Sequence, residues 1–309
     1  MALALFAGQG ELPGLVVAAC RARGEPVVLC EMEGVEVSAP GAGQRLSYRL
    51  ETLGTLISEL HRRGVDRVVF AGAMTRPSLD MARVDAATAP ILARLQPVFA
   101  RGDDALLREI VAIFEEAGFA VVGVHEVAPE LLPKVGVLTQ AGPDAALKAD
   151  AARGAEVVAA MGAADIGQAC VVAGGQVLAV EAIPGTAWML RSLMVPEARD
   201  EENPVLWAAD AVGDMLGDVA DWLSGPEAPR SGASSRDPAL PPGGILYKAP
   251  KPGQERRIDL PVIGPETVTL GAAVGLDGIV TEAGGVMVID RPRCVALADR
   301  LGLVLWVRG

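Results

Sequence analysis

The sequence opens with ALALFAGQGELPG (residues 2–14), and this stretch decides the fold class. Ala2–Ala7 is a continuous apolar run of strand length, which is typical of a strand buried on both faces. Gly8 and Gly10 then interrupt the run, and apolar residues at helical spacing follow them. A buried strand that passes through a glycine turn into a helix predicts the start of a parallel α/β domain.

The alternation of short apolar runs with amphipathic segments continues through the first half of the chain. Further strands are expected at residues 26–30, 67–71 and 119–124, and helices at 51–63 and 103–117. Strands that alternate with helices predict a mostly parallel sheet with helices on both faces. We therefore expect a Rossmann-like domain over residues 1–133, whose ligand-binding loops follow the carboxyl ends of the strands.

The pattern changes near residues 132–142, so we place a domain boundary there and expect a mixed α/β domain over residues 134–309. Its helices are expected at residues 145–161, 204–223, 265–274 and 292–301. Its strands are expected at residues 169–172, 177–181, 244–247, 278–280 and 286–289. Residues 224–243 are rich in Ser, Pro and Gly, which predicts a flexible surface insertion.

The composition limits the kinds of ligand that the protein can bind. Hydrophobic residues make up 51% of the 309 residues, enough for two cores, and the net charge is −12. Nucleic-acid binding needs a basic face, so we expect no nucleic-acid partner. A small phosphorylated ligand needs only a few local cations, so the charge balance does not exclude it.

The cysteines and the apolar runs indicate the compartment. The four cysteines form no C-x-x-C pair, which favours reduced thiols in a cytoplasmic protein over a zinc or redox site. No apolar run reaches the roughly 18 residues of a membrane span, and the first residues lack the positive leader of a signal peptide. We expect at most peripheral contact with a membrane.

Two loops that follow expected strands carry candidate phosphate ligands. A glycine turn before a helix, here Gly8, Gln9 and Gly10, can present backbone N–H groups to a phosphate. Pro13 replaces the third glycine of the dinucleotide-binding pattern, so a plain tight turn is an equal alternative. Arg76 is placed to grip a phosphate, although its spacing favours a solvated loop arginine.

Asp103, Asp104 and His125 are ionisable residues at the ends of expected elements. Spacing alone favours a helix cap for Asp103 and a first-turn acid for Asp104. His125 follows a strand, a better functional position than that of His61, but a lone histidine is usually structural. With two histidines in the chain, carboxylates and phosphate oxygens would hold any metal, which favours Mg²⁺ or Mn²⁺.

The densest polar cluster is YKAPKPGQERRIDLP, residues 247–261. It brings four cations, two acids and an amide into an otherwise acidic chain: Lys248, Lys251, Gln254, Glu255, Arg256, Arg257 and Asp259. Asp259 stands between apolar neighbours, where burial can make a carboxylate a metal ligand or a base. A solvated basic loop in which Asp259 caps a turn explains the same residues equally well.

Several motifs follow one another in an order that covers nearly the whole chain. They are residues 7–13, 71–72 with 76–77, 102–108, 118–119 with 123–126, 165–168, 179–182, and 248–261 with 263–264. Together they resemble the LpxI-type UDP-2,3-diacylglucosamine pyrophosphatases of Gram-negative bacteria. Each motif is modest alone, and the specificity lies in their combination.

The resemblance implies that substrate binds between two α/β domains and that a metal, Mg²⁺ or Mn²⁺, assists attack of water on the α-phosphorus. The products would be UMP and 2,3-diacylglucosamine 1-phosphate (lipid X), on the route to lipid A. The family's essential aspartate falls on Asp259, as metal ligand or as base, and we favour the metal ligand. Lys251, Gln254 and Arg257 are the other expected catalytic residues. The expected substrate-binding residues are Gly8, Gln9, Gly10, Arg76, Asp103, Asp104, His125, Gln168, Gly185, Thr186 and Lys248.

One departure from the family pattern bears on activity. Where many members read Glu-Gly-Thr-Asp, this chain reads Pro184-Gly185-Thr186-Ala187 and loses two acids. The alternatives to the expected activity are therefore a non-catalytic protein that binds a UDP-sugar lipid or lipid X, and a pyrophosphatase for another nucleotide-sugar. The resemblance also implies a homodimer and a cytoplasmic location, with at most peripheral contact with the inner membrane.

Overall fold

The computed structural model describes residues 2–74, 79–98, 103–195 and 236–309. The first domain is built on a five-stranded, all-parallel sheet in the order β3-β2-β1-β4-β5. Its strands are β1 Ala2–Ala7, β2 Val27–Met32, β3 Gln44–Tyr48, β4 Val65–Ala71 and β5 Ala120–Val121. Its helices are α1 Leu12–Ala22, α2 Leu53–Arg62, α3 Ala89–Leu95, α4 Asp103–Glu116 and α5 Val124–Val127, with 3₁₀ turns at Leu50–Thr52, Met81–Arg83, Gln96–Val98 and Pro129–Leu131.

Strand β1 buries alternate side chains in two different cores, as its unbroken apolar run predicts. Leu3 and Leu5 pack with Val16 and Val17 of α1 on one face of the sheet. On the other face, Phe6 packs against residues of α2 and α4. The predicted Rossmann-like sheet with helices on both faces is thereby confirmed.

The second domain contains a six-stranded mixed sheet in the order β6-β13-β11-β9-β7-β8 and a two-stranded β10-β12 pair. Its strands are β6 Gly136–Val137, β7 Ala169–Ala173, β8 Gln176–Val180, β9 Ile245–Lys248, β10 Val262–Ile263, β11 Gly278–Glu282, β12 Met287–Val288 and β13 Val304–Arg308. Its helices are α6 Ala145–Ala163, α7 Gly185–Arg191, α9 Pro265–Ala273 and α10 Arg291–Leu301. Helix α6 covers one face of the large sheet, and α7, α9 and α10 cover the other. The predicted mixed α/β class is confirmed.

The strand predicted at residues 119–124 is wrong in extent. Only Ala120–Val121 pairs with β4, because Gly123 is the N-cap of the short helix α5. Glu126 of α5 accepts a hydrogen bond from the Gly123 N–H at 2.7 Å. His125 therefore lies on a helix and not in a loop after a strand. The helix predicted at residues 204–223 lies outside the described residues.

The predicted insertion at residues 224–243 is described only from Arg236 onward. The Arg236 side chain is buried, and its guanidinium donates to the carbonyl oxygens of Pro241 and Gly243 at 2.5 and 2.8 Å. The Asp237 N–H also donates to the Leu193 carbonyl at 2.9 Å, so this end of the segment contacts the rest of the domain. Residues 224–235 lie outside the described residues.

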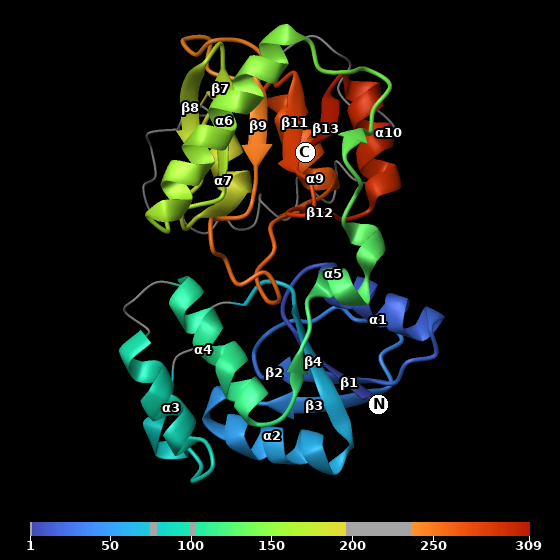
Figure 1. Cartoon of the computed structure of the whole chain (residues 1–309), viewed down its shortest axis with the longest axis vertical. Helices are drawn as coiled ribbons and strands as arrows, with labels where there is room; N and C mark the ends of the chain where they lie inside the picture. Colours follow the sequence, from blue (N-terminus) through green and yellow to red (C-terminus); the bar gives the residue numbers. More distant parts are fainter. Residues whose placement is uncertain (1, 75–78, 99–102, 196–235) are drawn as a thin grey trace, which may run out of the picture.

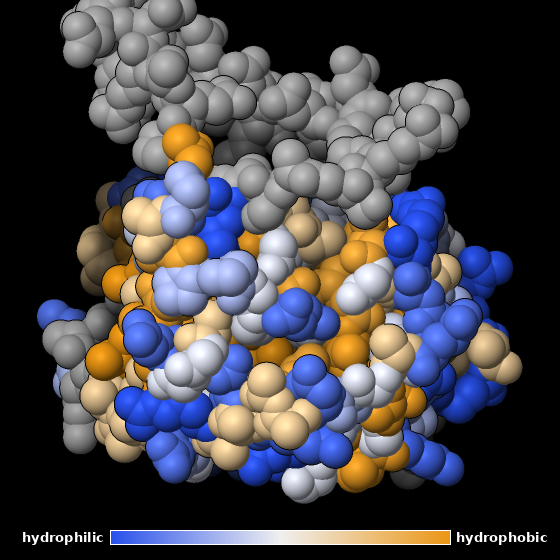
Figure 2. Space-filling view, turned by 90° about the horizontal axis from the view of Figure 1, so that it is seen from above, coloured by the Kyte–Doolittle hydropathy of each residue, from blue (hydrophilic) through white to orange (hydrophobic). Residues whose placement is uncertain are grey.

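The two domains meet at the carboxyl ends of their central strands. Figure 1 shows the segment between β9 and β10 (residues 249–261, the β9–β10 loop) reaching from the second domain down to the first, beside α4. The face seen from above in Figure 2 mixes hydrophilic side chains with smaller apolar areas. In the part of the chain that the structure describes, no helix has the length and apolar character needed to cross a membrane.

Candidate functional site

A cavity of about 360 Å³ lies between the two domains. The loops after β1 and β4 form one wall, and the end of β9 with the β9–β10 loop forms another. Its lining residues are Gln9, Gly10, Glu11, Leu12, Phe70, Gly72, Ala73, Val124, Gln168, Lys248, Arg256, Arg257, Ile258, Asp259, Leu260, Pro261, Val262, Met287 and Ile289. Ligands of open α/β sheets bind at this edge, so the cavity is the candidate active site.

The turn after β1 is built by close backbone approach to the turn after β4. The N–H of Gln9 donates to the carbonyl of Ala73 at 2.8 Å, and the Ala73 N–H donates to the Gln9 carbonyl at 3.0 Å. A Cβ on Gly8 would lie 2.4 Å from the Ala73 oxygen, so Gly8 permits this contact and does not itself line the cavity. Gln9 and Gly10 do line it, next to the first turn of α1.

We predict that Gly8→Ala destabilises the protein by about 1–3 kcal/mol, because the added methyl group overlaps a backbone carbonyl that is held by two hydrogen-bonded loops. Urea unfolding monitored by circular dichroism measures the change. Gly142→Ala is the matched control, since a Cβ there has no atom within 4 Å, and we expect it to stay within about 0.5 kcal/mol of the parent. Equal stability of the two variants would contradict the proposed packing role of Gly8.

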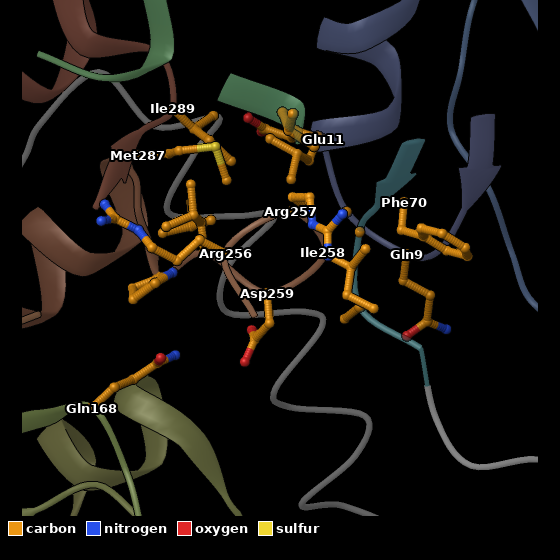
Figure 3. A pocket seen from close by; sticks show the side chains of 18 of the residues that line it. Gln9, Glu11, Phe70, Gln168, Arg256, Arg257, Ile258, Asp259, Met287 and Ile289 are labelled. Atoms are coloured by element: carbon orange, nitrogen blue, oxygen red, sulfur yellow. The ribbon is translucent and has the colours of Figure 1, made fainter. Parts of the chain in front are cut away.

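Asp259 is held in the cavity by the side-chain amide of Gln254. The Gln254 Nε2 donates to Asp259 Oδ2 and also approaches Gln168 Oε1 at 3.3 Å, while the N–H of Lys251 donates to Gln254 Oε1 at 2.8 Å. Burial raises the pKa of Asp259, and the Gln254 hydrogen bond opposes that shift. Figure 3 shows Asp259 and Gln168 on one side of the cavity, with Gln9 and Phe70 on the other. The carboxylate is thus oriented and faces the space between the domains.

Lys248 is a buried cation at the end of β9. Its Nζ donates to Thr186 Oγ1 at 2.7 Å and lies 3.8 Å from Glu181 Oε1, and the Lys248 and Glu181 side chains are 7% and 8% exposed. Thr186 donates in turn to Glu181, which also accepts a hydrogen bond from the Gln168 N–H at 3.1 Å. Burial lowers the pKa of Lys248, whereas the charges of Glu181 and Asp259 raise it. Lys248 thus lines the cavity, and its ammonium group is held by the oxygens of Thr186 and Glu181.

Glu181 was not among the predicted site residues. The sequence signal was present, because an acid stands at the end of an otherwise apolar strand in residues 177–181. A Cβ on Gly167 would lie 2.1 Å from the Glu181 carbonyl oxygen, so the neighbouring chain must approach without a side chain. This signal marks Glu181 as unusual, but its pairing with Lys248 is set by the fold and not by a local pattern.

The other cations of residues 247–261 are engaged by protein groups. Lys251 Nζ pairs with Asp165 at 2.6 Å and does not line the cavity, although its charge lowers the pKa of Asp259. Arg256 donates to the Gly284 carbonyl oxygen. Arg257 lines the cavity, but its guanidinium pairs with Glu255 and with Glu115 of the first domain.

Helix α4 holds the β9–β10 loop through three polar contacts, the α4 contacts. Asp104 accepts a hydrogen bond from the Glu255 N–H at 3.0 Å, Arg108 donates to the Gly253 carbonyl oxygen, and Glu115 pairs with Arg257 at 2.6 Å. Asp104 was predicted to bind substrate, yet it does not line the cavity. The α4 contacts fix the loop that carries Asp259 against the first domain.

A model of the LpxI N-terminal domain matches residues 2–131, and a model of the LpxI C-terminal domain matches residues 134–207 and 231–306. The chain belongs to the LpxI family. It is also 36% identical over 301 residues to a protein named UDP-2,3-diacylglucosamine pyrophosphatase LpxI from Caulobacter vibrioides. That match covers 97% of this chain and 95% of the relative. The family resemblance of the sequence is thereby confirmed.

The remaining residues expected from the LpxI resemblance lie outside the cavity lining or outside the described side chains. His125 folds its ring over the Gly123 backbone, where burial lowers its pKa. Gly185 starts α7 with a φ of 88°, and Thr186 contacts Lys248 instead of lining the cavity. Arg76 and the side chain of Asp103 are not among the described parts of the chain.

The cavity could bind a divalent cation only together with the substrate, because the residues described around it supply few protein ligands. Among the described residues, no group of three or more His, Cys, Asp or Glu side chains is placed to hold a metal ion. Mg²⁺ is commonly held by one or two carboxylates together with substrate phosphates and water. Asp259, with Gln168 on the same side of the cavity, fits a cation that is held mainly by substrate phosphates and water.

Proposed function

We propose that this LpxI-family chain hydrolyses the pyrophosphate bond of UDP-2,3-diacylglucosamine to UMP and lipid X, a step towards lipid A. Membership of the family makes the chain an enzyme of the hydrolase class. The proposal is carried by one observation: an oriented carboxylate, Asp259, and a buried cation, Lys248, line a single interdomain cavity. The name of the relative, which matches nearly the whole chain, supports the choice of substrate.

Each wall of the cavity has a role in this proposal. The first turn of α1, after Gly10, has N–H groups without helical partners and can bind a phosphate oxygen of the UMP half. Lys248 is placed to stabilise the negative charge that develops on the pyrophosphate during attack. The loop that carries Asp259 closes the other side of the cavity, so the two domains bind the two halves of the substrate.

Asp259 would hold Mg²⁺ or Mn²⁺ together with phosphate oxygens of the substrate. When bound, the cation supplies charge neutralisation that makes the α-phosphorus a better electrophile. Gln254 keeps the Asp259 carboxylate in the orientation that this role requires, since its amide donates to Oδ2. Asp259 as the base that activates water is the alternative role within the same proposal.

The substrate assignment is tested by comparing the purified protein on UDP-2,3-diacylglucosamine and on UDP-N-acetylglucosamine, with Mg²⁺, with Mn²⁺ and with excess chelator. We expect UMP release from the diacylated substrate alone, and its loss on chelation. Release from both substrates would favour a pyrophosphatase for other nucleotide-sugars. Binding of the diacylated substrate without turnover would favour a binding protein.

Ala187 supplies a second test, because it follows Thr186 on α7 and stands where many members carry an aspartate. We expect Ala187→Asp to raise kcat/KM by up to about tenfold if an acid beside the Lys248 contacts helps to position metal or substrate. Ala187→Asn is the size-matched control without charge. An unchanged rate in Ala187→Asp would mean that this chain does not use an acid there.

The proposed substrate also bears on location and assembly. We propose a cytoplasmic protein that contacts the inner membrane peripherally to reach its lipid substrate. A homodimer is proposed from the family resemblance. Neither property enters the chemistry proposed for the cavity.

A further inference from the structure

Four large apolar side chains are exposed on the α6–β7 loop, on the segment from the end of β8 to α7, and on α7 itself. Ile183 is 100% exposed, Trp188 58%, Ile166 50% and Val180 42%. We call these four residues the β8–α7 rim. Single exposed apolar residues are ordinary, whereas several together mark a surface that meets something else.

The three segments of the β8–α7 rim are held together at Glu181. Its N–H donates to the Ala169 carbonyl at 2.8 Å, its carboxylate accepts from Thr186 at the start of α7, and Gly167 lies against its backbone. Ile166, Val180 and Ile183 are therefore neighbours of one buried residue. The rim is fixed in shape by this junction and is not a set of loosely attached side chains.

The β8–α7 rim borders the candidate active site. Gln168, two residues after Ile166, lines the cavity, and Thr186, three residues after Ile183, contacts Lys248. Figure 1 shows β8 and α7 together at one side of the second domain, above the junction with the first domain. An exposed apolar surface thus adjoins a polar site proposed to bind a phosphorylated headgroup.

The composition of the rim favours a lipid surface over a charged partner. Exposed tryptophan together with exposed aliphatic residues is typical of protein segments that enter the interface of a bilayer. The nearest described cation on α7, Arg191, is paired with Glu266 at 3.2 Å, and the chain carries a net charge of −12. Insertion of apolar side chains is therefore the expected driving force for binding, and attraction to anionic lipids is not.

We propose that the β8–α7 rim docks on the surface of a lipid bilayer and so presents the cavity to lipids that reside there. This inference rests on the proposed function, because a diacylated substrate resides in a membrane. The fully exposed Ile183 and the amphipathic ring of Trp188 enter the interface, while the Lys248 and Asp259 side of the cavity receives the headgroup. The bilayer then supplies a surface that covers the exposed apolar residues.

Sedimentation with phosphatidylcholine vesicles tests the docking, using the full chain at low and at high salt. We expect Ile183→Asp to reduce the vesicle-bound fraction about tenfold, because a charged side chain at that depth is unfavourable, and we expect salt to have little effect on the parent. Met81→Asp is the matched control, since Met81 is 69% exposed on the first domain, and it should bind as the parent does. Circular dichroism verifies that both variants fold.

Three results would overturn the proposal. These are equal binding by Ile183→Asp and Met81→Asp, loss of parent binding at high salt, and a parent dimer in gel filtration that Ile183→Asp dissociates. The last would assign the β8–α7 rim to a second copy of the chain. Hydrolysis of a short-chain, monomerically dispersed substrate separates docking from the proposed function. We expect Ile183→Asp to hydrolyse this dispersed substrate at the parent's rate. If the parent protein does not hydrolyse it, the proposed function is contradicted and the docking is not.

Discussion

Replacing Asp259 with Asn is expected to lower kcat for UDP-2,3-diacylglucosamine by about three orders of magnitude, with the fold intact. Asn keeps the size of the side chain but removes the charge that would hold a cation or take a proton from water. The Gln254 amide, which donates to Oδ2, can still donate to the Asn oxygen, so the loop should keep its conformation. Steady-state kinetics and thermal unfolding of the same preparation measure the two effects.

Asp80→Asn is the matched control for this substitution. Asp80 is exposed and accepts a hydrogen bond from the Ala82 N–H at 3.0 Å, a capping role that Asn performs equally well. We expect its kcat to match the parent's. If Asp259→Asn folds normally and also retains the parent's kcat, the assignment of Asp259 to catalysis is wrong.

Replacing Lys248 with Met is expected to lower kcat/KM by about 10²–10³-fold, because the cation beside the developing phosphate charge is lost. It should also destabilise the protein by about 3–5 kcal/mol, since Glu181 is left buried without its cation. The double variant Lys248→Met/Glu181→Gln separates these effects. We expect it to recover most of the lost stability in urea unfolding and none of the activity. Recovery of activity in the double variant would contradict a role for the Lys248 charge.

The same pair predicts the alkaline side of the pH profile. Burial lowers the pKa of Lys248, so the charged form, and with it kcat/KM, should be lost as the pH rises through a value below that of an ordinary lysine. The Glu181 charge raises this pKa, and therefore Glu181→Gln should move the alkaline limb to lower pH. Asp259, the other charge near Lys248, is unchanged in that variant. An alkaline limb that does not move in Glu181→Gln would rule out Lys248 as its source.

The sequence predicts those strands that are buried on both faces of the sheet. The run Ala2–Ala7 has no polar residue to face solvent, so a central parallel strand is the structure that accommodates it. The edge strand β3, Gln44–Tyr48, was missed because its side chains are mostly exposed and its residues resemble a loop. β5 is shorter than predicted because Gly123 redirects the chain into α5. Edge elements depend on their partners, which a local pattern does not contain.

The candidate site is predicted in part for the same reason. Lys248 and Asp259 were found because they share one short, charge-rich segment. Arg257 was expected to act on the substrate, but its guanidinium pairs with Glu115, which lies 142 positions earlier in the chain. Glu181 was missed as a site residue because its contact with Lys248 depends on how β8 and β9 lie on either side of β7. Such long-range pairings arise from topology and not from spacing.

Hydrolysis of UDP-2,3-diacylglucosamine in ¹⁸O-labelled water by the purified protein with Mg²⁺ tests the central claim most directly. Mass spectrometry of both products locates the label. We expect one labelled oxygen in UMP, because in the proposed reaction water attacks the α-phosphorus in the cavity that Asp259 and Lys248 line. Label in lipid X, or no turnover while the substrate binds, would contradict it.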